Sequence, residues 1–540
     1  SDEFRMVRTQ PIVFSPLDPH LLFFATNCLW QTRDGGQNWT QLSPDLTRKT
    51  YEIPASVGNF RARPTAQPRQ RGVIYTIAPS PLEKSRIWAG TDDGLIHLTT
   101  DGGRNWTNVT PPQIGAWWKI SLLEASHFDK STAYAAVNTI RLDDLRPHIY
   151  RTNDAGKSWK EIVQGIPPNE NVNAVREDPR RRGLLFAGTE RAVYVSFDDG
   201  ENWRSLRLNM PATSVRDLIV KDDDIAVATH GRGFWILDNI TPLRQLGASS
   251  QQTLLFKPQT AVRVHWNFNT DTPLPPDEPA GENPPEGAMI DYSLGEDAAG
   301  PVTLEIKDEQ GNVVRRYAST DPLPSPDPKL KIPRYWVRPP RVLSDKPGLH
   351  RFLWNMHAAP LPEAEREYPM TAITHETAPQ PTGPWMPPGE YSVSLTTGGK
   401  TLSQPLTLKM DPRVTASTAD LAKQFELSKA LFQMRAALQP IGKSYDALVA
   451  ELTKAKERAA GKSELEPIEA LRKKMEEFAD PAAIRAGQPP ELDVLSKVKK
   501  LFGDLQAVDA APTPQQEAAV SSLQRDTQSV TEKWRALPAN

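Results

Sequence analysis

Six carboxylate residues in the first half of this chain could supply an acid–base pair. Hydrolysis of a glycosidic bond needs a carboxylic acid and a second carboxylate, about 5–5.5 Å apart for retention or about 6.5–9.5 Å apart for inversion. The candidates are Asp92, Asp93, Glu124, Asp143, Asp144 and Glu190. Spacing along the chain does not give distances in space, so the sequence leaves open whether any two of them form such a pair.

Aromatic and cationic residues in the same region fit ligand binding as well as catalysis. A tryptophan exposed beside arginines and carboxylates suits a sugar or a peptide. The candidates are Trp117, Trp118, Arg141, Arg191, His230 and Arg232. Each has a structural alternative. The tryptophans can pack between sheets, and in an extended segment they would point to opposite sides; His230 and Arg232 flank Gly231, which can close a tight turn.

A repeated octapeptide indicates how these residues are positioned. The pattern Ser/Thr-x-Asp-x-Gly-x-x-Trp occurs four times. Aspartate and glycine favour a tight turn, and tryptophan offers a large apolar ring to bury between neighbouring sheets. We therefore expect structural and not catalytic roles for the aspartates and tryptophans of the repeat: Asp34, Trp39, Asp101, Trp106, Asp154, Trp159, Asp198 and Trp203.

The rest of each repeat predicts a four-stranded antiparallel sheet. Apolar runs that end in a threonine, such as Leu22–Asn27 and Ile87–Asp92, precede the octapeptides, and a fifth copy, Ile225–Leu237, lacks the octapeptide. Repeats of this length are typical of β-propeller blades. About five blades are visible in residues 1–245. We expect them to belong to a larger ring, as part of a longer polypeptide or completed by a partner chain; a closed ring of five would contradict this.

The four octapeptides, together with Ala228–Trp235, resemble the bacterial BNR-repeat (Asp-box) glycosyl hydrolase and sortilin (VPS10)-like β-propeller family. The resemblance implies a secreted or periplasmic location, although the chain opens Ser-Asp-Glu-Phe and shows no signal peptide. It also implies that ligands bind on the rim opposite the octapeptides. That rim would carry most of the candidate residues, with the connecting segments Thr40–Arg71 and Pro111–Lys119. The arginine triad of sialidases and the cysteine-rich modules of sortilins are not recognisable here.

Two further domains are predicted behind the propeller. Residues 246–412 alternate proline-rich stretches with strand-like runs such as Ala288–Leu294, and resemble the immunoglobulin-like β-sandwich of flagellar hook-capping proteins. Residues 413–540 have helical periodicity and predict an α-helical bundle. Its first helix begins at Ser417, which has a capping-box spacing to Asp420, and Pro440 is expected to kink or divide it.

Composition and missing motifs exclude several functions. The net charge of −2 gives no electrostatic footprint for nucleic acid, and no apolar run is long enough for a membrane span. A single cysteine, Cys28, and nine scattered histidines predict no disulfide framework and no metal site, and no cofactor motif is present. The leading hypothesis is a binding or assembly protein that presents one propeller rim to a glycan or protein. The alternative is a glycoside hydrolase with a carboxylate pair on that rim or in a cleft formed with further blades.

Overall fold

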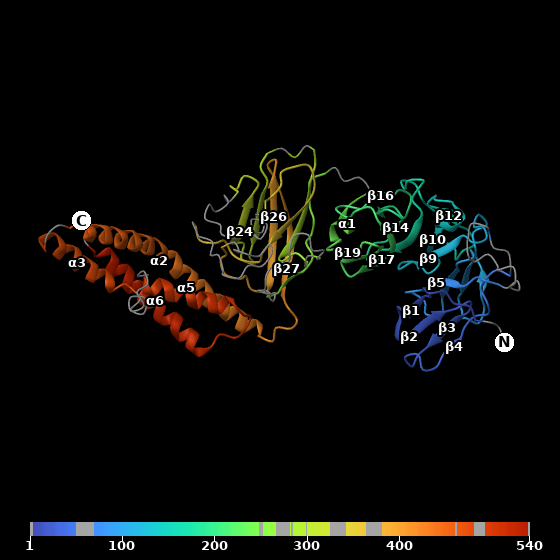
Figure 1. Ribbon diagram of the computed structural model, residues 1–540, viewed down its shortest axis with the longest axis horizontal. Helices are drawn as coiled ribbons and strands as arrows, with labels where there is room; N and C mark the ends of the chain where they lie inside the picture. The colour runs from blue at the N-terminus through green and yellow to red at the C-terminus, as the bar shows by residue number, and fades with distance from the viewer. Residues whose placement is uncertain are drawn as a thin grey trace. The chain divides into compact units, whose positions relative to one another are not determined.

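The computed structural model of the chain forms two compact units, Ser1–Ser250 and Gln251–Asn540 (Figure 1). It describes residues 4–49, 54, 70–247, 252–265, 281, 284–296, 298, 300–323, 342–362, 381–459, 462–479 and 492–537. Most of the expected ligand loop Thr40–Arg71 and much of the proline-rich sequence lie outside these residues. The chain is mainly β, with several small antiparallel sheets followed by a helical C-terminal region.

The described part of the first unit contains five antiparallel sheets, which follow one another in chain order from blue to green in Figure 1. Sheet 1 holds β1 (Ile12–Ser15), β2 (Asp18–Ala25), β3 (Leu29–Thr32) and β4 (Thr40–Gln41). Sheet 2 holds β5 (Ile74–Pro79), β6 (Ile87–Thr91), β7 (Ile96–Thr99) and β8 (Thr107–Asn108). Sheet 3 holds β9 (Lys119–Ala125), β10 (Ala133–Asn138), β11 (Ile149–Thr152) and β12 (Lys160–Glu161). Sheet 4 holds β13 (Val172–Glu177), β14 (Leu185–Thr189), β15 (Val193–Ser196) and β16 (Arg204–Ser205). Sheet 5 has three strands: β17 (Ser214–Lys221), β18 (Asp224–His230) and β19 (Phe234–Leu237).

Each sheet buries side chains against the next, because the strands are apolar on both faces. Phe23 and Ala25 of sheet 1 lie in one apolar cluster with Ile77 and Ala89 of sheet 2. The opposite face of sheet 2, including the fully buried Trp88, packs with sheet 3. Similar clusters join sheet 3 to sheet 4 and sheet 4 to sheet 5. The first strand of each sheet also lies beside the first strand of its neighbour, and we call these first strands the inner strands.

The four octapeptides form turns that are closed by their aspartates. Oδ1 of Asp34 accepts hydrogen bonds from the Asn38 backbone N–H at 2.9 Å and from the Thr32 hydroxyl at 2.8 Å. The same bonds recur in the other three turns, at Asp101, Asp154 and Asp198. These bonds hold the pKa of Asp34 and Asp101 near 2, with the bond from the backbone N–H making the largest contribution. The carboxylates therefore stay ionised and are fully engaged within their turns.

Three of the four tryptophans fasten their sheet to the preceding one. The indole N–H groups of Trp106, Trp159 and Trp203 donate to the backbone carbonyls of Leu42 at 3.1 Å, Val109 at 2.8 Å and Ile162 at 2.8 Å. Each acceptor is the residue directly after the fourth strand of the preceding sheet. Trp39 departs from the expected burial between sheets, because the described residues include no sheet before sheet 1, and it remains 37% exposed.

The second unit begins with two sheets that share one apolar core. The first holds β20 (Leu254–Leu255), β22 (Ala288–Leu294) and β25 (Gly348–Trp354), and the second holds β21 (Ala261–Arg263), β23 (Thr303–Lys307), β24 (Val313–Ala318), β26 (Gly389–Thr397) and β27 (Lys400–Met410). Ile290 and Trp354 of the first sheet are buried in one cluster with Leu304 and Val393 of the second. β21 pairs with β27 in parallel, and the other strand pairs are antiparallel.

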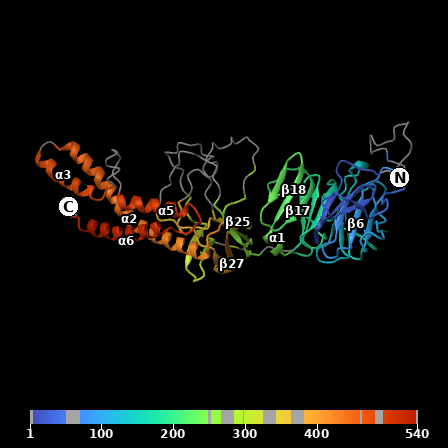
Figure 2. The ribbon, with the colours of Figure 1, turned by 90° about the horizontal axis from the view of Figure 1, so that it is seen from below.

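Helices α2 (Thr418–Arg458), α3 (Lys462–Glu476), α5 (Asp493–Gln506) and α6 (Pro514–Arg535) complete this unit. Figures 1 and 2 show α2, α5 and α6 side by side, and a second apolar cluster lies among them. Ser417 and Asp420 form the predicted capping box. Pro440 does not divide α2, which continues through it. None of the helices within the described ranges combines the length and the hydropathy that a membrane span requires.

Candidate functional site

The hairpin connections sort the candidate residues onto two edges of the first unit. The four octapeptide turns lie at one end of the strands, which we call the octapeptide rim. The turns between the second and third strands lie at the other end, which we call the opposite rim. It carries Asp92 and Asp93 between β6 and β7, the segment between β10 and β11, Glu190 between β14 and β15, and Gly231 between β18 and β19.

Glu124 does not join the other candidate carboxylates on the opposite rim. It is the penultimate residue of β9, which starts at the opposite rim and runs toward the octapeptide rim. Its carboxylate contacts Arg176 at 2.9 Å and His127 at 3.4 Å, and Arg176 also pairs with Asp217. Burial raises the pKa of Glu124, but the charge of Arg176 and the hydrogen bond from His127 outweigh it and leave the pKa below its usual value. Glu124 thus belongs to an ion-pair row across sheets 3, 4 and 5.

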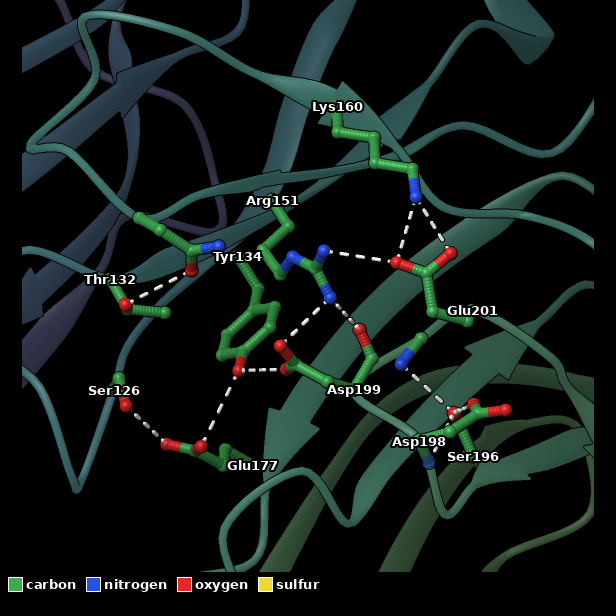
Figure 3. A network of polar contacts seen from close by, with 12 residues as sticks. Ser126, Thr132, Tyr134, Arg151, Lys160, Glu177, Ser196, Asp198, Asp199 and Glu201 are labelled. Carbon is green, nitrogen blue, oxygen red and sulfur yellow. Dashed lines mark hydrogen bonds and ion pairs between the residues drawn. The ribbon is translucent and has the colours of Figure 1, made fainter. Parts of the chain in front are cut away.

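A polar network near the octapeptide rim ties sheets 3 and 4 together (Figure 3). The Tyr134 hydroxyl donates to Asp199 at 2.6 Å, and Arg151 contacts Asp199 at 2.8 Å and Glu201 at 3.0 Å. Glu177 accepts a 2.7 Å bond from the Ser126 hydroxyl. Each carboxylate of this network already has a donor in the chain, so the network is best explained as a structural contact between neighbouring sheets.

On the opposite rim, β-bulges place one polar residue at the start of four inner strands. The strand register slips next to Tyr75 in β5, Ser121 in β9, Asn173 in β13 and Arg216 in β17. A bulge leaves its extra residue out of the regular pairing and redirects the side chain. Four consecutive sheets therefore each place a polar residue outside the regular strand pairing, near the opposite rim.

Lys119, the first residue of β9, is the least compensated charge at this level. Its ammonium lies 4.6 Å from the centre of the Tyr75 ring, and no carboxylate of the described residues forms an ion pair with it. Burial lowers the pKa of Lys119; Tyr75 opposes this change, and the positive charges of Arg141 and Arg216 add to it. Three cations from sheets 3 and 5 thus act on one another here.

Asp92 is a carboxylate beside these cations, and the charges of both Arg141 and Lys119 act on it. It is buried, accepts a 2.8 Å bond from the Val73 backbone N–H, and lies 3.7 Å from Arg141. Loss of solvation raises its pKa to about 6, against the lowering effects of that bond and of Arg141. Asp93 is also buried, and its carboxylate accepts from the Thr91 hydroxyl and the Arg48 backbone N–H. Burial likewise raises the pKa of Asp93.

The remaining candidate carboxylates are dispersed. Glu190 accepts from the Asn173 side chain at 2.9 Å and pairs with Arg216 at 3.2 Å, so it borders the cation group. Asp144 forms a two-point pair with Arg146, which lowers the pKa of the carboxyl to about 2. Asp143 is exposed, in a left-handed backbone conformation at the end of a short helical turn.

The two tryptophans are not in an extended segment. Trp117 has a φ of 67° and is buried, with its backbone N–H bonded to the Asp93 carbonyl at 2.9 Å and its ring 5.9 Å from the Arg141 guanidinium. Trp118 is half-buried, 4.7 Å from the His148 ring. Trp117 therefore contacts both Arg141 and the backbone of Asp93. Arg191, His230 and Arg232 are exposed on the opposite rim.

The residues that sequence reasoning missed are Tyr75, Lys119, Asn173 and Arg216. Tyr75, Asn173 and Arg216 share a signal, which is a polar residue directly after an apolar one at the start of an inner strand: Ile74-Tyr75, Val172-Asn173 and Val215-Arg216. Lys119 precedes the bulge at Ser121 and does not share this signal. Strict alternation of apolar and polar residues hides the shared signal, since a bulge breaks that alternation.

The fold and the site together define a mainly β chain whose first unit is a series of small repeated sheets. No protein-family model matches it. Residues of the chain are 26% identical to the oligoxyloglucan-reducing end-specific xyloglucanase of Emericella nidulans, over 30% of this chain and 18% of that protein. They are 24% identical to the photosystem II assembly lipoprotein Ycf48 of a Synechococcus strain, over 36% of this chain and 49% of that protein. They are 32% identical to the vacuolar protein sorting/targeting protein 10 of Pyrenophora teres, over 17% of this chain and 6% of that protein.

Among solved structures, the GH74 xyloglucanase from Xanthomonas campestris matches with 13% identity and a TM-score of 0.32, over 75% of this chain and 80% of that one. The chain spans about half the length or less of the curated relatives that it matches. These weak sequence similarities support a relationship to β-propeller proteins.

Proposed function

We propose that the first unit is a β-propeller binding module that holds a negatively charged segment of a protein or glycan at its opposite rim. The observation that carries this proposal is the half-buried ammonium of Lys119, which forms no ion pair with a carboxylate of the described residues and is acted on by the charges of Arg141 and Arg216. A buried charge is unfavourable unless it is paired. An anion bound among these three cations would provide the missing compensation.

The proposal includes the organisation of the chain. Residues 1–245 act as BNR-type blades, residues 246–412 as an immunoglobulin-like spacer, and residues 413–540 as a helical module, in a secreted or periplasmic protein. The similarity to Ycf48, a photosystem II assembly lipoprotein, supports a binding role. On this proposal the carboxylates of the site are not reactive groups: Glu190 orients Arg216, and Asp92 orients Arg141.

Binding of charged probes tests the proposal. We expect oligogalacturonate or a hexaglutamate peptide to bind the chain, as measured by calorimetry. Lys119→Met should weaken this binding at least tenfold, which corresponds to about 1.4 kcal/mol of binding free energy. Lys160→Met on the octapeptide rim, where Lys160 pairs with Glu201, is the matched control and should leave affinity unchanged. Equal binding of an uncharged xyloglucan oligosaccharide, insensitive to Lys119→Met, would contradict an anion site.

Glycoside hydrolysis is a second candidate function, favoured by the raised pKa of Asp92, about 6, because a general acid must hold its proton near neutral pH. In that case the chain releases reducing sugar from xyloglucan oligosaccharides, and Asp92→Asn lowers the rate at least 100-fold. Asp144→Asn, which removes an ionised carboxylate with a pKa of about 2, should have little effect. Identical rates for Asp92→Asn and the unmodified chain would exclude this role.

A further inference from the structure

The outer face of sheet 1 is apolar, and no sheet of the described residues covers it, although Phe4 packs edge-on against Trp30 at 5.0 Å. Strand register places Ile12 and Phe14 of β1 on the same face as Leu22 and Phe24 of β2 and Trp30 of β3. Ile12 and Phe14 are 60% and 61% exposed. The corresponding face of sheet 2, which includes Ile77 and Ala89, is buried against sheet 1. The outer face of sheet 1 thus has the composition of an interface between sheets, without a neighbouring sheet.

Trp39 lies beside this face and lacks the bond that the other three octapeptide tryptophans make. Its ring contacts Phe24 edge-on at 5.8 Å. Its indole N–H donates to no residue of the described part of the chain, whereas Trp106, Trp159 and Trp203 each donate to the carbonyl that follows a fourth strand. A tryptophan N–H normally has an acceptor when its ring is buried. The regularity predicts what the acceptor of Trp39 would be: the carbonyl after the fourth strand of one more sheet.

The octapeptide glycines show the same difference. A Cβ built on Gly103 would lie 2.8 Å from the Leu42 carbonyl oxygen, and one on Gly156 would lie 2.6 Å from Val109. These are the residues whose carbonyls bind the tryptophans. A Cβ on Gly36 would meet only atoms of Trp39 itself, the nearest at 3.7 Å. The first octapeptide therefore has the shape that fits a preceding sheet, and none of the described sheets lies against it.

The outer face of sheet 5 is its counterpart at the other end of the series. Ile219 of β17 and Ile236 of β19 both pair with Ala226 of β18, so their side chains lie on one face of the sheet. Phe234 pairs with Ala228, two residues further along, and lies on the same face. Phe234 is 83% exposed, and Ile219 and Ile236 are also exposed. This face corresponds to the face of sheet 4, with Val193 and Val195, that is buried against sheet 5.

We infer that a four-stranded antiparallel sheet of the same repeat, carried by a polypeptide segment outside residues 1–540, docks on the outer face of sheet 1. The residue after its fourth strand accepts the hydrogen bond from Trp39. Further sheets of this segment reach the outer face of sheet 5 and so complete the ring. A second copy of the chain does not fit this role, because its exposed sheet 5 has three strands, and the matching faces of its four-stranded sheets are already covered.

Site-specific photo-cross-linking tests this inference. The photoreactive residue p-benzoylphenylalanine is placed at position 12 or 14 of the full chain, expressed in the cells that naturally make the protein. Because both side chains are exposed, the substitutions leave the fold intact. After irradiation, we expect the cross-linked peptide to come from outside residues 1–540 and from a polypeptide that carries the Ser/Thr-x-Asp-x-Gly-x-x-Trp repeat. The same residue at position 82, exposed in the turn between β5 and β6, is the control and should not capture that peptide.

Several outcomes would overturn the inference. They are a cross-link from position 14 to residues 251–540 of the same chain, a cross-link to a polypeptide without the repeat, and no cross-link from either position. Self-association is tested by sedimentation of the purified chain. A dimer that is lost in both Phe14→Glu and Phe234→Glu would identify a second copy as the occupant and would likewise refute the proposal.

Discussion

Replacing Trp203 by alanine is expected to lower the free energy of unfolding of the first unit by about 3–5 kcal/mol. The ring is 3% exposed and lies in the apolar cluster that joins sheets 3 and 4. Its N–H bond to the Ile162 carbonyl would also be lost, which leaves a buried acceptor without its partner. Urea unfolding followed by far-ultraviolet circular dichroism measures the change.

Trp39→Ala is the matched comparison, since Trp39 occupies the same position of the first octapeptide. It should cost about 1 kcal/mol or less, as for most exposed positions, because its N–H donates to no described residue and its ring contacts Phe24 alone among the aromatic residues described. Equal losses for the two variants would show that the tryptophans act within their own hairpins. The role of the rings as contacts between sheets would then be wrong.

The repeated sheets could be predicted because each repeat contains its own local instructions. Aspartate and glycine specify the turn, and the apolar strands specify two buried faces, so the predicted strands agree with the observed ones within a few residues. The length of α2 could not be predicted, because Pro440 lowers local helix stability, whereas packing against α3, α5 and α6 stabilises the helix. The exposure of Trp39 escaped prediction for a similar reason, since burial depends on a neighbouring sheet and not on the octapeptide.

The candidate site was only partly predictable. Asp92, Arg141 and Glu190 could be found because hairpin topology assigns their turns to one rim, and the structure places them around the cation group. Glu124, a candidate for the same carboxylate pair, lies apart from them, since it stands near the far end of an inner strand. Lys119 and Arg216 were missed because their significance comes from charges on neighbouring sheets, which spacing along one strand does not reveal. The same limit applies to Trp117, which is buried and has a positive φ in place of an extended conformation.

Asp92→Asn is expected to raise the free energy of unfolding of the first unit at pH 7 by up to roughly 3 kcal/mol, at 1.36 kcal/mol per pKa unit. The pKa of Asp92 is raised from 3.8 to about 6 in the fold, mainly by loss of solvation. Between these two values the folded state binds more protons than the unfolded state, so the stability of the unmodified chain falls as the pH rises from 4 to 6. Asparagine does not ionise, and its side-chain oxygen can still accept from the Val73 N–H.

The difference between Asp92→Asn and the unmodified chain should therefore be small at pH 4 and reach its full size above pH 6. Asp101→Asn is the control of opposite sign. The pKa of Asp101 is lowered to about 2, chiefly by the Asn105 backbone N–H, so this substitution should destabilise the chain above pH 4 and have less effect below pH 2.

Urea unfolding at pH 4, 5, 6 and 7 measures the Asp92 profile. A gain that does not change with pH would show that the Asp92 carboxylate is not held unfavourably in its ionised form. The opposite rim would then lack the unfavourable ionisation of Asp92 on which a general-acid role depends. The predicted profile would instead show that Asp92 is ionised on this rim near neutral pH at a cost in stability.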